Sequence, residues 1–189
     1  MSTRKKQTWK DSLYFCTITC YDWLPLFEIT DYYKQIYKWF DILKSKGIKI
    51  TAYVIMPNHL HVILFLPNQS KTIDKVVSNW KRFMAYDIVN KLNDKKQFKI
   101  LKKLESSVSE KEKQKGKKHQ VFMPSFDAKV LITEKFIRQK LTYIHMNPVS
   151  KKWHLADEYI SYPYSSAAFY ENENYNGYMI THIEEVFED

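Results

Sequence analysis

Two histidines, His59 and His61, interrupt the apolar stretch YVIMPNHLHVILFL with a single leucine between them. If this stretch contains a β-strand, alternate residues point to the same face, so the two imidazoles lie side by side while Leu60 points the other way. Two imidazoles placed in this way can converge on one divalent metal ion. Two half-exposed histidines on a sheet would give the same pattern, so the pair alone leaves both interpretations open.

A third ligand must come from another element, and the helix predicted over residues 134–147 offers one. Tyr143 and Asn147 are four residues apart and share one face of this helix, with Lys140 on the same side. The amide oxygen of Asn147 suits Mg²⁺ or Mn²⁺, and a tyrosine hydroxyl can act as a nucleophile. His145 is rotated by about 200° from Tyr143 and cannot share its site. Taken alone, a packed tyrosine and an asparagine at a helix end explain the pair equally well.

Strands and helices alternate in an order that could bring these side chains together. Apolar and β-branched patterns predict strands over residues 13–21, 49–57, 59–67 and 120–132, and helical spacing predicts helices over residues 31–45, 71–93 and 134–147. The tight turn at Pro57 and Asn58 makes the second and third strands antiparallel neighbours. The order indicates an α+β protein with a ferredoxin-like antiparallel sheet and helices packed on it.

Residues 95–118 break the alternation. They hold ten lysines, three glutamates and few apolar residues, which is typical of a solvated, charged insertion that is at most partly helical. A tyrosine-rich tail begins at about residue 150. We expect residues 1–189 to form one domain that carries this insertion and this tail.

The overall charge favours a polyanionic partner. The net charge is +9, and only three of the 30 basic residues are arginine. Lysine binds phosphates as a point charge, whereas arginine reads guanine with two hydrogen bonds, so the composition favours contacts with a nucleic-acid backbone. No apolar run approaches the roughly 20 residues that cross a bilayer, and no signal peptide is recognisable. We therefore expect a cytoplasmic protein without a membrane partner.

Four segments together resemble a known family. MPNHLHVIL, WKRFMAYDI, YIHMNPV and YPYSSAAFY occur in this order and cover roughly residues 12–170. They resemble the HUH-type (Y1) single-strand tyrosine transposases, and specifically the REP-associated tyrosine transposase branch.

The resemblance implies a ferredoxin-like catalytic domain with an assigned site. In this family the metal, Mg²⁺ or Mn²⁺, would be held by His59, His61 and Asn147, with Tyr143 as the nucleophile. The implied reaction cleaves and rejoins single-stranded or hairpin DNA through a 5′-phosphotyrosine intermediate, in a monomer or a homodimer. The expected DNA-binding residues are Lys81, Arg82, Arg138 and Lys140.

Two alternatives remain. A non-catalytic single-stranded nucleic-acid-binding protein of the same fold fits the +9 charge and the 16% aromatic content, but it gives no reason for the histidine pair and the Tyr–Asn pair to coexist. A replication-initiator-like nickase would use the same chemistry. The short length and the lack of a helicase segment argue against it.

Overall fold

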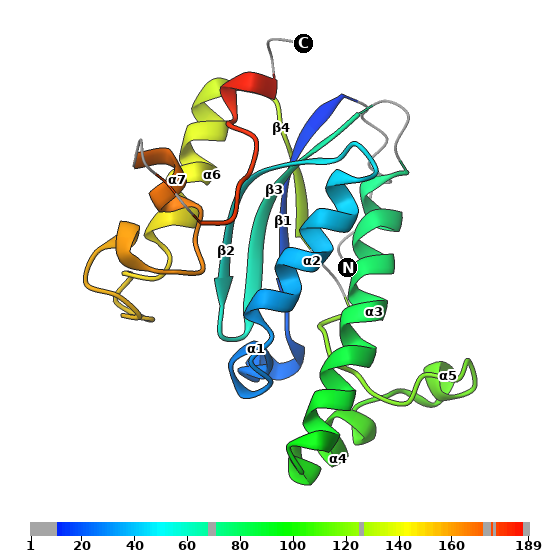
Figure 1. Ribbon diagram of the computed structural model, residues 1–189. Coiled ribbons are helices and arrows are strands. Elements are labelled where there is room, and N and C mark those ends of the chain that lie inside the picture. Colours follow the sequence, from blue (N-terminus) through cyan, green and yellow to red (C-terminus); the bar gives the residue numbers. More distant parts are fainter. Residues whose placement is uncertain (1–10, 68–70, 125–126, 172–174, 176, 187–189) are drawn as a thin grey trace.

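The computed structural model describes residues 11–67, 71–124, 127–171, 175 and 177–186, and it shows an α+β fold built on one four-stranded sheet (Figure 1). The strands are β1 (Ser12–Thr19), β2 (Lys49–Met56), β3 (His59–Leu66) and β4 (Asp127–Leu131). Their order across the sheet is β2-β3-β1-β4, and every neighbouring pair is antiparallel. This is the arrangement that the ferredoxin-like prediction requires.

Helices connect the strands and cover both faces of the sheet. The α-helices are α1 (Leu26–Ile29), α2 (Tyr33–Lys44), α3 (Ile73–Asp94), α4 (Phe98–Ser106), α5 (Glu110–Lys113), α6 (Glu134–Met146) and α7 (Ala167–Glu171). Short 3₁₀ turns form at η1 (Tyr21–Trp23), η2 (Tyr159–Ser161) and η3 (Glu184–Val186). In Figure 1, α2 and α3 lie on one side of the sheet and α6 lies on the other. The predicted helices are confirmed, with boundaries shifted by one or two residues.

The face beneath α2 and α3 carries the larger core. On β3 this face presents every second residue: Leu60, Val62, Leu64 and Leu66. Ile36 and Phe40 of α2 and Trp80 of α3 pack against them. The alternation of side chains along a strand therefore places the larger apolar set under the two long helices, as the sequence parity predicted.

The opposite face holds the histidines and a smaller core. Ile63 continues the histidine side of β3 and packs with Phe15 of β1 and Val54 of β2. Ile137 and Ile144 of α6 close this cluster from above. Thr133 caps α6, because its Oγ1 accepts a hydrogen bond from the backbone N–H of Phe136. This second layer, with α6 on the outside, buries much of the histidine face.

The tyrosine-rich tail packs along the free edge of β2. Residues 164–166 pair with this strand, since Ile55 N–H donates to the carbonyl of Tyr164 and Ser166 N–H donates to the carbonyl of Tyr53. The Ser166 hydroxyl also accepts from Tyr53 N–H at 2.9 Å. Ser166, the second serine in YPYSSAAFY, thus binds the tail to the sheet through both its backbone and its hydroxyl.

The lysine-rich stretch is more ordered than the sequence suggested. Residues 95–118 contain both α4 and α5. Leu101 and Leu104 of α4 are buried in the larger core, so α4 is part of the folded domain, whereas α5 has no buried residue. Within the described ranges, none of the helices is both long and apolar enough to cross a membrane.

Candidate active site

His59 and His61 begin β3 and lie almost completely buried, at 3% and 4% exposed. Their ring centroids are 4.7 Å apart with nearly perpendicular planes. Burial lowers the pKa of His59 to about 4, with a contribution from Lys152, and burial lowers the pKa of His61 to about 3, aided by His59 and Lys140. Both imidazoles are therefore neutral at pH 7, the form that binds metal ions.

Hydrogen bonds to Nδ1 fix the orientation of both rings. The Asn58 amide nitrogen donates to the carbonyl of Trp23 at 2.9 Å, which directs its Oδ1 towards His59 Nδ1 at 2.7 Å. Since Oδ1 only accepts, His59 must carry its proton on Nδ1 and keep the Nε2 lone pair free. On the neighbouring strand, Thr17 Oγ1 lies 2.9 Å from His61 Nδ1. Such contacts to the second ring nitrogen are typical of metal-ligating histidines.

Tyr143 of α6 reaches the same place from above the sheet. Its hydroxyl oxygen is 3.4 Å from His61 Nε2, a long hydrogen bond of the kind expected before substrate is bound. The Tyr143 residue is 46% exposed, so part of its side chain is in contact with solvent. Phe15 supports both rings, stacking on His61 at 5.4 Å and meeting Tyr143 edge-on at 6.0 Å.

Lys140, one turn earlier on α6, brings a positive charge to this group. Its ammonium nitrogen lies 4.8 Å from the ring centroid of Phe15 and 5.3 Å from that of Tyr143. Burial, followed by repulsion from Lys129, lowers the pKa of Lys140, while Asp127 opposes this shift. The lysine therefore stands beside the tyrosine ring, as the helical spacing predicted.

Asn147 is the C-cap of α6 and is only 8% exposed. Its Oδ1 is buried without a hydrogen-bond partner. A buried amide oxygen left unpaired is costly, so an atom of this kind calls for an explanation, such as a bound ion. Among the described residues, His, Cys, Asp and Glu side chains form no group of three placed to hold a metal, so a third protein ligand would have to be an oxygen of another type.

His145 points away from this group, as its position on α6 predicted. Its Nε2 lies 3.0 Å from the Ser166 hydroxyl, and burial lowers its pKa to about 4. Tyr53 is also remote, because it is buried in the larger core on the other face of the sheet. His145 and Tyr53 therefore lie outside the site, whereas Tyr143 contacts His61 directly.

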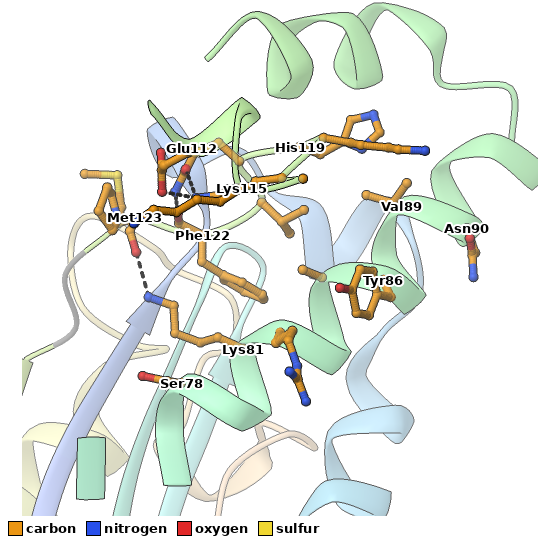
Figure 2. A pocket seen from close by; sticks show the side chains of 18 residues that line it. Ser78, Lys81, Tyr86, Val89, Asn90, Glu112, Lys115, His119, Phe122 and Met123 are labelled. Carbon is orange, nitrogen blue, oxygen red and sulfur yellow. Dashed lines mark hydrogen bonds and ion pairs between the residues drawn. The ribbon is translucent and has the colours of Figure 1, made fainter. Parts of the chain in front are cut away.

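The predicted DNA-binding residues do not all lie at this site. Lys81 and Arg82 are on α3, across the sheet from the histidines, and line a groove of about 900 Å³ (Figure 2). Lys81 donates to the carbonyl of Met123 at 2.6 Å, and Arg82 donates to Asn79 at 3.2 Å. Arg138 forms an exposed ion pair with Glu134 at 2.7 Å. Only Lys140 lies beside Tyr143.

The same groove collects lysines from the charged stretch. Figure 2 shows the segment with Glu112, Lys115 and His119 facing the α3 residues Lys81 and Tyr86 across the groove. Lys115, Lys117 and Lys118 all belong to the lining. Two basic features that are separate in the sequence therefore share one surface, which lies away from the histidine face.

Sequence reasoning missed the residues that orient the histidines. Asn58 directly precedes His59, and its role in a turn was the only one assigned to it. Thr17 lies 44 positions from His61, and only the antiparallel register, which pairs these two residues, brings them together. The adjacency of Asn58 to the pair was a usable signal, whereas Thr17 gave none.

No family model matches the chain, and no curated protein matches it significantly. Among solved structures, the chain is similar to a REP-associated tyrosine transposase bound to a REP hairpin, with a TM-score of 0.60 and 17% identity over 97% of this chain and 93% of that one. A second structure, from Deinococcus radiodurans and provisionally called a transposase, is 17% identical over 76% of this chain and 95% of its own. Its TM-score is 0.35, too low to support an argument. The resemblance seen in the sequence motifs is thus confirmed at the level of the fold: the chain has the fold of a REP-associated tyrosine transposase.

Proposed function

We propose that this protein is a metal-dependent tyrosine transposase that cleaves and rejoins single-stranded hairpin DNA through a 5′-phosphotyrosine intermediate. The observation that supports this most directly is the position of the Tyr143 hydroxyl, 3.4 Å from His61 Nε2. A hydroxyl nucleophile beside two neutral imidazoles that can bind a metal ion is an arrangement suited to metal-assisted phosphoryl transfer.

The metal would be Mg²⁺ or Mn²⁺, held by His59, His61 and Asn147. Three features of the chain fit such an ion: both imidazoles are neutral, His59 has a free Nε2 lone pair, and the buried Asn147 Oδ1 lacks a partner. A divalent ion bound there would polarise the scissile phosphate and offset the charge that develops on its oxygens.

Tyr143 supplies the nucleophile. Its hydroxyl oxygen forms a bond to phosphorus while the bond from phosphorus to the 3′ oxygen breaks, which leaves a 3′-hydroxyl on one fragment and a phosphotyrosine on the 5′ end of the other. The tyrosine must lose its proton as it attacks, and the Lys140 ammonium, 5.3 Å from the ring centroid, brings a positive charge to the place where the phosphate would lie. Because the phosphodiester energy is kept in the adduct, the 3′-hydroxyl can attack it and rejoin strands without ATP.

Single-stranded DNA is the substrate class that the surface supports. The net charge of +9 attracts a polyanion, and the groove beside α3 adds a basic surface on the far side of the sheet. The structurally similar transposase is bound to a hairpin, and we extend that ligand class to this chain as part of the proposal.

A covalent-adduct assay tests the proposal. The full-length protein is incubated with end-labelled single-stranded hairpin DNA and Mn²⁺, and the products are separated under denaturing conditions. We expect a labelled protein band with the wild type and none with Tyr143→Phe, while Tyr159→Phe, at a half-exposed tyrosine on η2, serves as a control that should still form the adduct. DNA binding without any adduct would instead identify a non-catalytic binding protein.

A further inference from the structure

The turn that follows β1 holds an unusual backbone conformation next to the site. Asp22 and Trp23 have φ values of 50° and 55°, in the left-handed region that residues other than glycine rarely adopt. Side-chain contacts help to hold the turn: the Asn58 amide donates to the carbonyl of Trp23 at 2.9 Å, and Lys103 pairs with Asp22 at 2.5 Å. Strain of this kind persists where surrounding contacts enforce it, commonly at ligand clamps.

The strained turn presents the Trp23 side chain to solvent beside His59. Trp23 is 51% exposed, although tryptophan side chains are on average highly buried in proteins. Its ring meets the imidazole of His59 edge-on with 5.7 Å between centroids. The same Asn58 amide therefore fixes both the His59 ring and the backbone that carries the indole.

Lys152 and Trp153, in the segment after α6, complete a small aromatic and cationic group. The Lys152 ammonium nitrogen lies 4.9 Å from the ring centroid of Trp23 and 5.1 Å from that of Trp153. Trp153 lies 5.4 Å from the His59 ring. One ammonium group thus contacts two indoles that both border the same histidine.

We propose that Trp23, with Lys152 and Trp153, forms a subsite for an unpaired nucleobase next to the scissile phosphate. This inference rests on the proposed function and specifies how the single strand is held. Aromatic rings bind unpaired bases by stacking, and a neighbouring lysine binds the phosphate. The cation–π contact of Lys152 at this exposed position is weak, so a base can take its place on the indole while the ammonium turns to the backbone.

The position of the Trp23 indole relative to Tyr143 indicates where on the DNA strand the bound nucleotide lies. Trp23 and Trp153 border His59, whereas Tyr143 contacts His61, so the subsite and the nucleophile lie at opposite ends of the histidine pair. A strand with its phosphate over the two histidines would place its neighbouring base at Trp23. Because every base has a stackable face, this subsite positions the strand with little preference for sequence.

The test compares a strand with bases and a strand without them. A fluorescein-labelled oligothymidylate of about 15 nucleotides lies within the site sizes of single-strand binders. An oligomer of the same length with abasic sugars throughout keeps the phosphates and removes the stacking. Binding is measured by anisotropy in the Tyr143→Phe background, with Mn²⁺ present, so that no strand is cut.

We expect Trp23→Ala to weaken oligothymidylate binding by roughly 5- to 150-fold, the range that one base–aromatic stack contributes. Binding of the abasic oligomer should not change. Trp23→Phe should restore most of the loss, because phenylalanine still offers a face for stacking. Trp39→Ala, which removes an indole from α2 on the other face of the sheet, is the matched control and should leave both affinities unchanged.

An equal loss for both oligomers, or no loss for either, would overturn the nucleobase subsite. The adduct assay on the same wild-type preparation separates this failure from that of the proposed function. Adduct formation together with base-independent binding would refute only the subsite. Base-dependent binding through Trp23 without any adduct would refute only the strand-cleaving activity.

Discussion

At the scale of single residues, Thr17 provides a test of the site that spares its proposed ligands. Its hydroxyl contacts His61 Nδ1 at 2.9 Å, and valine has nearly the same shape without this hydroxyl. We expect Thr17→Val to weaken Mn²⁺ binding by about 10- to 100-fold, the usual effect of losing a contact that orients a metal ligand. Isothermal titration with Mn²⁺ measures this directly.

A second threonine-to-valine change separates the metal effect from a general loss of stability. Thr51 is buried in β2, and its hydroxyl donates to the carbonyl of Ile63 at 3.2 Å rather than to a proposed metal ligand. Each change should cost on the order of 1 kcal/mol in the free energy of unfolding, the typical net value of one hydrogen bond. If Thr51→Val weakens Mn²⁺ binding as much as Thr17→Val does, the Thr17–His61 contact has no specific role.

Individual residues also show what the sequence could and could not predict at the site. Helical periodicity placed Tyr143, Asn147 and Lys140 on one face of α6 and His145 on another, and strand parity placed the histidines together. These predictions need only local geometry. The contact between Thr17 and His61, and the approach of Trp23 to His59, depend on pairing between distant segments, which a single sequence does not encode in a readable local pattern.

At the scale of secondary-structure elements, the structure changes the interpretation of the lysine-rich stretch, residues 95–118. The ten lysines suggested a solvated arm, yet α4 buries Leu101 and Leu104 in the larger core. The apolar residues were too few to stand out against the charge, although their helical spacing was present in the sequence. The remaining part of the stretch faces α3 across the groove in Figure 2. Removing residues 95–118 as a block would therefore damage the core as well as the groove.

Point changes in the groove test whether its lysines contact DNA. Lys115 and Lys118 are exposed and line the groove, so Lys115→Gln combined with Lys118→Gln removes two charges without removing core side chains. For single strands the slope of log affinity against log salt concentration changes by about 0.7 for each phosphate contact. We expect the slope of the double variant to be shallower by about 1.4, with reduced affinity for all sequences alike.

The matched control changes two exposed lysines on α2, Lys34→Gln with Lys38→Gln, which keeps the net charge equal to that of the groove variant. This control should retain the wild-type salt slope. Identical slopes for the groove variant and the wild type would exclude Lys115 and Lys118 from the DNA interface.

At the scale of the whole molecule, the strand order β2-β3-β1-β4 matches the ferredoxin-like prediction. The sheet is also packed on both of its faces. An antiparallel sheet needs only one covered face, so the order of strands and helices does not by itself require helices on both sides. Here α6 and the tail cover the second face and bring Tyr143 to the histidines. Strand and helix patterns identify the elements, but they do not specify which face a terminal helix will cover.

Burial of His145 makes the stability of the whole fold depend on pH. Its folded pKa of about 4 lies below the ordinary histidine value of 6.5, so the unfolded chain binds a proton more readily between these pH values. Stability is therefore full above pH 6.5 and falls as the pH drops towards 4. We expect His145→Gln to flatten this decline by up to about 1.4 kcal/mol per pH unit, the limit for one proton.

Urea unfolding of the wild type and of His145→Gln at pH 7 and pH 5, both without added metal, measures this difference. The buried pair His59 and His61 contributes in the same direction and remains in both proteins, so only the difference between them reports on His145. Parallel pH dependence in the two proteins would show that His145 does not titrate abnormally.

The central claim is that Tyr143 forms a covalent bond to DNA, and a peptide mass measures it most directly. After reaction with hairpin DNA and Mn²⁺, nuclease treatment and trypsin digestion release residues 141–151 as one peptide, in which Tyr143 is the single tyrosine. We predict that this peptide gains the mass of a 5′-linked nucleotide and that fragmentation places the addition on Tyr143. A nucleotide found on a different tyrosine, or strand cleavage with this peptide unmodified, would contradict the account.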